Sequence, residues 1–289
     1  MSILQWVQLQ NAQANYQPIR QIEKAKLMRL KLGSIANSAI KLGRAAGIDI
    51  FLHWTFILAP LFLVYQWRWQ RNLPWTTVFI LLGLLMAAFA SVLLHEYGHA
   101  LMARRFGIQT KDIIITPIGG LARLEGMPQK AFEELLITIA GPLVNLVIAA
   151  LLAVYIFASG GAWIPSDGFE GLAEFPVVLM WMNIALFVFN LIPAFPMDGG
   201  RILRSALSLA MEHRTATLLA GILGMVLAIT FAITGIAMKQ YPFVLIGGFV
   251  FFAALYEIRN PVVSKGEDLE SVGGDANVES QRQEDRDSP

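Results

Sequence analysis

Long apolar runs separated by short polar segments dominate the pattern of this chain. A membrane-spanning helix needs roughly 17–25 mostly apolar residues, and several runs reach that length without a charged side chain. We therefore predict an all-α polytopic membrane protein with about six transmembrane helices. The expected spans are residues 50–67, 76–103, 132–158, 175–195, 215–238 and 241–256.

The segment between the second and third spans has a different pattern. A β-branched run at 113–116 is followed by a Pro/Gly turn at 117–120 and by a second alternating run at 121–124. Two such runs around a turn predict a β-hairpin. We expect this short hairpin to lie at the membrane.

The two ends of the chain differ in charge. Residues 1–48 carry seven Lys or Arg and are expected to form a basic N-terminal segment, followed by a six-span domain at 49–258. Residues 259–289 are acidic and rich in Ser, Gly, Gln and Asp, a composition that favours disorder. No targeting peptide is recognisable at the start, which favours a bacterial plasma membrane over an organelle.

Lys and Arg alternate between rich and poor connecting segments, which predicts the orientation. Successive segments carry seven, two, five, zero, three, one and four of these residues. Because cytoplasmic loops carry an excess of Lys and Arg, the rich segments are expected inside. Both termini are then cytoplasmic, as an even number of spans requires.

The amino-acid composition limits which partners and which metal ligands can be expected. Only 15% of the residues are charged, against about 25% in soluble domains. A net charge of +1 gives no reason to expect nucleic acid as a partner. The chain has no Cys, so a transition metal would have to bind His, Asp or Glu.

The second span carries the strongest chemical signal, His95-Glu96-Tyr97-Gly98-His99. Residues four apart lie on one face of a helix, so His95 and His99 can hold one metal ion together. Glu96 lies beside them as a candidate general base toward water activated by zinc. The alternative is a set of buried polar groups paired for structural reasons, but ionisable groups at membrane depth are costly and generally functional.

Asp198 is the favoured third ligand, since a catalytic zinc site usually has three protein ligands. Two prolines interrupt the helix before it, and two glycines after it let the backbone turn. Asp198 could instead cap a helix that starts near Arg201. His53 at the start of the first span and His213 in a charged loop are not favoured as ligands.

The predicted topology brings these groups to one depth. The second and fourth spans run in the same direction, which places both His residues and Asp198 toward the cytoplasmic face. Gly141, Pro142 and Asn145 lie in the first turns of the third span, at the same side. Asn145 could donate to an oxyanion or make helix-to-helix hydrogen bonds, and the sequence leaves both open.

These motifs together resemble the site-2 protease family of zinc intramembrane metalloproteases, peptidase family M50. The matching pieces are the 95–99 motif, Gly141-Pro142-Leu143-Val144-Asn145, residues 190–200 and the hairpin, within residues 48–258. The resemblance implies one Zn²⁺ held by His95, His99 and Asp198, Glu96 as general base, and Asn145 as a substrate-positioning or oxyanion group. It also implies hydrolysis of peptide bonds in or beside transmembrane segments of membrane proteins.

Two departures from the family pattern concern regulation. Many relatives insert a PDZ domain between spans or append nucleotide-sensing CBS domains, and no segment of this chain fits either. A catalytically inactive scaffold and a metal-ion transporter are the alternative functions. A transporter would need polar residues leading toward both faces, whereas the predicted polar groups gather near one face. A di-iron oxidase would need more His than the four present.

Overall fold

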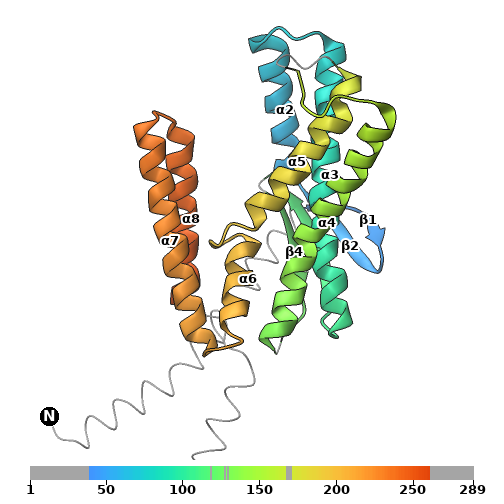
Figure 1. The fold of residues 1–289 in the computed structure, drawn as a ribbon. Coiled ribbons are helices and arrows are strands. Elements are labelled where there is room, and N and C mark those ends of the chain that lie inside the picture. Colours follow the sequence, from blue (N-terminus) through green and yellow to red (C-terminus); the bar gives the residue numbers. More distant parts are fainter. Residues whose placement is uncertain (1–38, 118, 127, 129, 167–170, 261–289) are drawn as a thin grey trace, which may run out of the picture.

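The computed structural model describes residues 39–260, apart from 118, 127, 129 and 167–170. This part is mostly helical with a small sheet, as predicted (Figure 1). Helices α2 to α5 lie together, α7 and α8 form a separate pair, and α6 lies between the two groups (Figure 1). The helical elements are η1 (Trp54–Ile57), α2 (Leu58–Tyr65), η2 (Gln66–Gln70), α3 (Trp75–Arg105), α4 (Ala131–Ser159), η3 (Leu172–Glu174), α5 (Phe175–Asn190), α6 (Asp198–Leu207), α7 (His213–Ala237) and α8 (Tyr241–Arg259).

Within the described residues, five helical segments are long and apolar enough to cross a membrane: α3, α4, η3 with α5, α7 and α8. They match the second to sixth expected spans. The first expected span, 50–67, instead begins as a strand and continues through η1, α2 and η2. The fourth was expected to reach residue 195, but α5 ends at Asn190, before the two prolines that cannot donate a helical hydrogen bond.

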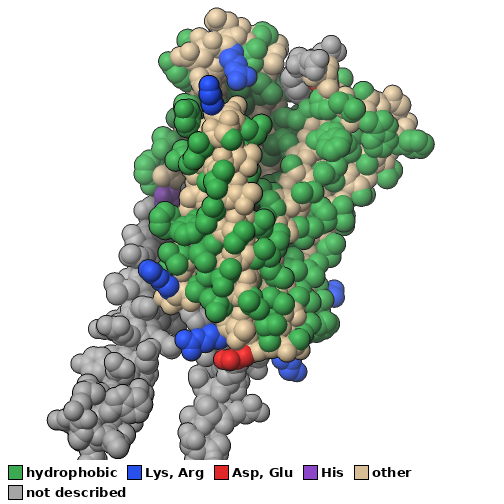
Figure 2. All heavy atoms as spheres, turned by 60° about the vertical axis from the view of Figure 1, so that its left-hand side comes forward, with side chains coloured by type: hydrophobic (Ala, Val, Ile, Leu, Met, Phe, Trp, Pro, Cys, Tyr) green, Lys and Arg blue, Asp and Glu red, His purple; other side chains and the backbone are tan. Residues whose placement is uncertain are grey.

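The surface of the helices is apolar. On the face in Figure 2, hydrophobic side chains cover the middle, and Lys and Arg side chains lie toward the upper and lower ends. Phe157 on α4 is 76% exposed and Leu245 on α8 is 77% exposed. Contiguous apolar surface of this extent is unfavourable in water and is solvated by lipid chains. The fold is that of a multi-pass membrane protein.

Four strands form one sheet: β1 (Ala39–Ala45), β2 (Ile48–His53), β3 (Thr110–Thr116) and β4 (Gly119–Leu124), in that order. The predicted hairpin is confirmed as the antiparallel pair β3–β4. Strands β1 and β2 form a second hairpin, and β2 pairs with β3 in parallel. Sequence analysis missed this second hairpin, because a short apolar run fits a strand or a helix equally well.

The sheet is fastened to the end of α3. Tyr97 donates its hydroxyl proton to Ala45 O at 2.9 Å, and Arg104 donates to Ala46 O at 2.6 Å. Within the sheet, Arg123 Nε donates to the buried Asp112 at 2.5 Å, and this hydrogen bond raises the pKa of Arg123 above its ordinary value.

The expected boundaries of the terminal segments are only partly covered by the structure. Strand β1 begins at Ala39, so residues 39–48, expected in the basic N-terminal segment, belong to the sheet. The remainder of that segment, 1–38, lies outside the described residues. The disordered tail was predicted at 259–289; Arg259 is instead the last residue of α8, and residues 261–289 lie outside the described residues.

A buried ion-pair network holds α6 between α4 and α8. Arg204 on α6 is 4% exposed and donates to Glu134 on α4 at 2.5 Å and to Glu257 on α8. Its guanidinium also lies 5.4 Å from the ring centre of Phe195. Because α6 begins with Asp198, this network bears on the position of a predicted metal ligand.

Replacing Arg204 by Met should destabilise the fold strongly, because it leaves the buried carboxylate of Glu134 without its closest partner. Breaking a buried pair in this way costs about 3–5 kcal/mol. The measurement is reversible unfolding in mixed detergent micelles. The control is Lys41→Met, since Lys41 pairs with Asp49 through side chains that are 51% and 32% exposed and should change stability by less than about 1 kcal/mol. Equal effects of the two substitutions would contradict the role given to Arg204.

Candidate active site

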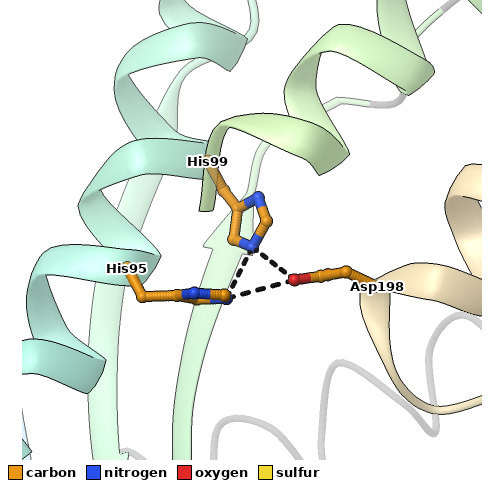
Figure 3. Close-up of side chains that lie close together, drawn as sticks. All are labelled: His95, His99 and Asp198. Carbon is orange, nitrogen blue, oxygen red and sulfur yellow. Dashed lines mark hydrogen bonds and ion pairs between the residues drawn. The ribbon is translucent and has the colours of Figure 1, made fainter. Parts of the chain in front are cut away.

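Three buried side chains from two helices converge on one point. His95 and His99 lie one turn apart on α3, and Asp198 is the first residue of α6. His95 Nε2, His99 Nε2 and Asp198 Oδ2 form a triangle in which each pair of atoms is 3.1 Å apart (Figure 3). Among the described residues, these three form the group of His, Asp and Glu that could hold a metal ion.

Helix α3 presents its ligands on a face pressed closely against α4. Ser91, His95 and His99 recur every four residues, so all three lie along this face. Between the two ligands, Gly98 contacts α4 so closely that a Cβ there would lie 2.6 Å from Ala140 O. The missing side chain therefore lets the two helix backbones approach at the level of the site.

The turn between α5 and α6 places Asp198. Met197 N donates to Ala194 O at 3.0 Å within this turn. A Cβ at Gly199 would lie 2.2 Å from Ile192 O, so the turn can fold back on itself only because this residue is glycine. The helix starts at Asp198 rather than near Arg201, and the carboxylate faces the two His residues instead of capping the helix.

The hydrogen bonds on the Nδ1 side of the two imidazoles determine which ring nitrogen carries the proton and which can bind a metal ion. His99 Nδ1 lies 2.9 Å from Ile137 O, and His95 Nδ1 lies 2.6 Å from Asn145 Oδ1. Both oxygens can only accept, so each Nδ1 carries the proton. In a neutral ring, Nε2 then keeps a lone pair that can bind a metal ion. The two Nε2 atoms and Asp198 Oδ2, each 3.1 Å from the other two, can thus all be ligands of one cation.

The geometry fits a zinc ion. Ligand atoms about 2.0 Å from a tetrahedral zinc lie about 3.3 Å apart, close to the observed triangle. Helix α4 packs tightly against both nitrogens: a Cβ at Gly141 would lie 2.2 Å from His99 Nε2 and 2.8 Å from His95 Nε2, so the two rings can take these positions only beside a glycine. Two imidazoles and one carboxylate also match the ligand set of known catalytic zinc sites, which leave a fourth position open.

Glu96 and Asn145 have different neighbours. Glu96 is partly buried and packs against β4, where a Cβ at Gly120 would lie 2.5 Å from its Cγ. Asn145 is fully buried behind His95, on the Nδ1 side of the ring, and its amide donates to Asn183. The structure thus brings Asn145 to a metal ligand rather than to the side that faces the ion.

The other two His residues lie away from the cluster, as expected. His53 Nδ1 lies 2.7 Å from Thr55 Oγ1 at the start of η1. His213 Nδ1 lies 3.2 Å from Ser208 Oγ at the start of α7.

Sequence reasoning missed Asn183 on α5 and Ser91 on α3, which extend the polar contacts of Asn145. A signal for both was present. Asn183 is a polar residue inside an apolar span, where such groups need partners, and Ser91 lies one turn before His95 on the same face.

Comparison with known proteins places the chain in a family. The model of peptidase family M50 matches residues 83–167 and 166–233, which is more than half of the chain. The chain belongs to peptidase family M50. This M50 chain is 36% identical to the solved structure "Site-2 Protease from Methanocaldococcus jannaschii", with a TM-score of 0.54, over 78% of this chain and 97% of that one. The predicted membership of the site-2 protease family is confirmed.

Curated M50 relatives are named as zinc metalloproteases. Zinc metalloprotease MJ0392 of Methanocaldococcus jannaschii is 36% identical over 226 residues, which are 77% of this chain and 61% of the relative. Putative zinc metalloprotease sll0528 of Synechocystis is 35% identical over 60% of this chain and 45% of its own length. Putative zinc metalloprotease Rip3 of Mycobacterium tuberculosis is 33% identical over 58% of this chain and 44% of its own length. The matched part therefore spans between 44% and 61% of these relatives.

Gly141→Ala should abolish zinc binding, because the new Cβ would occupy the space beside both Nε2 atoms. The measurement is zinc content per chain after dialysis against a weak chelator. Gly248→Ala on α8 is the matched control, since a Cβ at that position would meet no described atom within 4 Å apart from its own stretch of helix. The Gly141→Ala variant keeping the zinc content of the parent would show that the ion does not bind at this triangle.

Proposed function

We propose that this protein is a zinc-dependent intramembrane endopeptidase with one zinc ion per chain. The observation that carries the proposal is a buried triangle of metal ligands inside a bundle of membrane helices, with the carboxylate of Glu96 on the same helix. Family membership and the zinc metalloprotease names of the relatives support the same reaction.

Glu96 is the proposed general base and acid. When bound, zinc acts as a Lewis acid that polarises a carbonyl oxygen and makes water more acidic. Glu96 accepts a proton from the attacking water as the oxygen–carbon bond forms. It then passes that proton to the leaving nitrogen as the peptide bond breaks. The described residues provide no hydrogen bond or ion pair to Glu96 in the structure, which leaves its carboxylate available for this transfer.

Asn145 supports the reaction from behind His95. It was expected to position substrate or to hold an oxyanion. Its Oδ1 instead contacts His95 Nδ1 at 2.6 Å, and its Nδ2 donates to Asn183 Oδ1 at 3.1 Å. These contacts favour a role in holding the metal ligand over direct contact with the oxyanion.

The sheet offers a way to present the substrate. A peptide bond in a helix has its carbonyl engaged, so a transmembrane substrate must unwind before attack. Strand β4 lies at one edge of the sheet, and its Gly120 contacts Glu96. An unwound substrate strand that pairs with this edge would pass beside the proposed general base.

The proposed substrates are transmembrane proteins in the same bilayer. The distribution of Lys and Arg supports cytoplasmic termini, and a bacterial plasma membrane remains the proposed location. Neither nucleic acid nor a nucleotide-sensing domain is part of the proposal. The scaffold and metal-ion transporter alternatives differ from it in a measurable way, because neither requires turnover at Glu96.

Glu96→Gln should abolish cleavage and leave zinc bound, because it removes the proton acceptor without changing a metal ligand. The test is cleavage of a panel of tagged single-span membrane proteins by the purified protein, with the variant alongside. Cleavage by the parent alone, blocked by a zinc chelator, is the expected result.

Other outcomes of this assay discriminate between the functions. Turnover by Glu96→Gln at the parent rate would refute the assigned role of Glu96. Zinc bound at one per chain with no cleavage of any substrate would favour the scaffold. Zinc uptake into sealed vesicles that contain the protein would favour the transporter.

A further inference from the structure

A line of buried polar side chains leads away from the proposed zinc site across three helices. Asn145 on α4 and Asn183 on α5 are both 0% exposed, and Ser91 on α3 is 3% exposed. Polar groups in an apolar bundle are costly unless each is hydrogen-bonded. Neither the metal ligands nor the proposed proton transfer accounts for Asn183 and Ser91.

The line is continuous from the metal ligand outward. His95 Nδ1 lies 2.6 Å from Asn145 Oδ1, and Asn145 Nδ2 donates to Asn183 Oδ1 at 3.1 Å. Asn183 Nδ2 in turn donates to Ser91 Oγ at 3.2 Å and to Leu179 O at 2.9 Å. Ser91 ends the line by donating its hydroxyl proton to Ala87 O at 3.1 Å.

The carbonyls Leu179 O and Ala87 O, which accept from Asn183 and Ser91, fix the direction of every hydrogen bond in this line. Leu179 O can only accept, so the amide atom of Asn183 beside it must be nitrogen, and the oxygen of Asn183 faces Asn145. Asn145 must then donate through Nδ2, which leaves its oxygen toward His95. An oxygen there requires a proton on His95 Nδ1, so that in the neutral ring Nε2 has the lone pair.

The reverse direction is incompatible with the metal site. If Asn145 turned its NH₂ group toward the ring, His95 Nδ1 would have to accept and Nε2 would carry the proton. That proton would then lie where the ion binds. Partners that fix the orientation and tautomer of a metal-bound His typically contribute 10–100-fold in metal affinity.

We propose that Asn183 is a positioning residue that orients His95 for zinc through Asn145, with Leu179 O and Ser91 as its anchors. This inference rests on the proposed zinc site. It differs from simple helix packing, because hydrogen bonds that only hold helices together need no particular direction. Asn183 itself contacts neither the ligand triangle nor the proposed substrate path.

The test compares two substitutions of Asn183 by their zinc dissociation constants, measured by competition with a chromophoric chelator. Asn183→Leu removes both donor and acceptor and should weaken zinc binding about 10–100-fold. Asn183→Asp keeps a side-chain oxygen that can accept from Asn145 Nδ2 whether or not the carboxyl is protonated. It should retain an affinity close to that of the parent.

Two further measurements separate positioning from packing. Thr217→Val is the control, since Thr217 is 1% exposed and bonds only within α7, to His213 O at 2.8 Å. It should leave zinc affinity unchanged. The visible spectrum of bound Co²⁺ reports ligand geometry directly, and Asn183→Leu should alter it while Asn183→Asp should not.

A result in which Asn183→Leu lowers the thermal stability of the metal-free protein but leaves zinc affinity and the Co²⁺ spectrum unchanged would overturn the proposal. Loss of affinity in both Asn183 variants would also overturn it, because Asp preserves the bond to Asn145. The readout does not involve proteolysis. A parent protein that binds zinc but cleaves nothing would therefore refute the proposed function and leave this role of Asn183 intact.

Discussion

The convergence of two imidazole nitrogens and one carboxylate oxygen is the constraint around which the rest of the structure is arranged. These three atoms lie 3.1 Å apart, and all three side chains are buried. They can bind one cation together only if each side chain is held in this position. Each is therefore held from behind: His99 by Ile137 O, His95 by Asn145, and α6 by the ion pairs of Arg204.

Three glycines, which have no side chain, also shape the site. Gly98 brings α3 against α4, Gly141 lets the two His rings pack against α4, and Gly199 lets the α5–α6 turn fold back. At each position a single Cβ would lie within 2.8 Å of backbone or ligand atoms. The glycines thus allow close approach of the backbone, which membrane helices otherwise reach only with small residues at their contacts.

The sequence was sufficient to predict five of the spans and the three side chains that meet at the candidate metal site, for local reasons. The spacing of His95 and His99 is a property of a single helix, and the prolines and glycines around Asp198 predicted a turn. The relay through Asn183 and the ion pair between Arg204 and Glu134 join residues 38 to 92 positions apart. No local pattern predicts such a pairing. Strand β2 was missed because its pairing with β3 depends on residues about sixty positions further along, and β1 was missed with it because β1 pairs with β2.

That last pairing has a consequence for biosynthesis. Strand β2 lies parallel to β3, with Asp49 opposite Asp112, and the chain between them makes up η1, α2, η2 and α3. A growing chain therefore cannot complete the sheet until this intervening segment has entered the membrane and β3 has left the ribosome. Asp198 is synthesised later still. A chain that ends before β4 thus lacks a finished sheet, and one that ends before Asp198 lacks a complete set of candidate metal ligands.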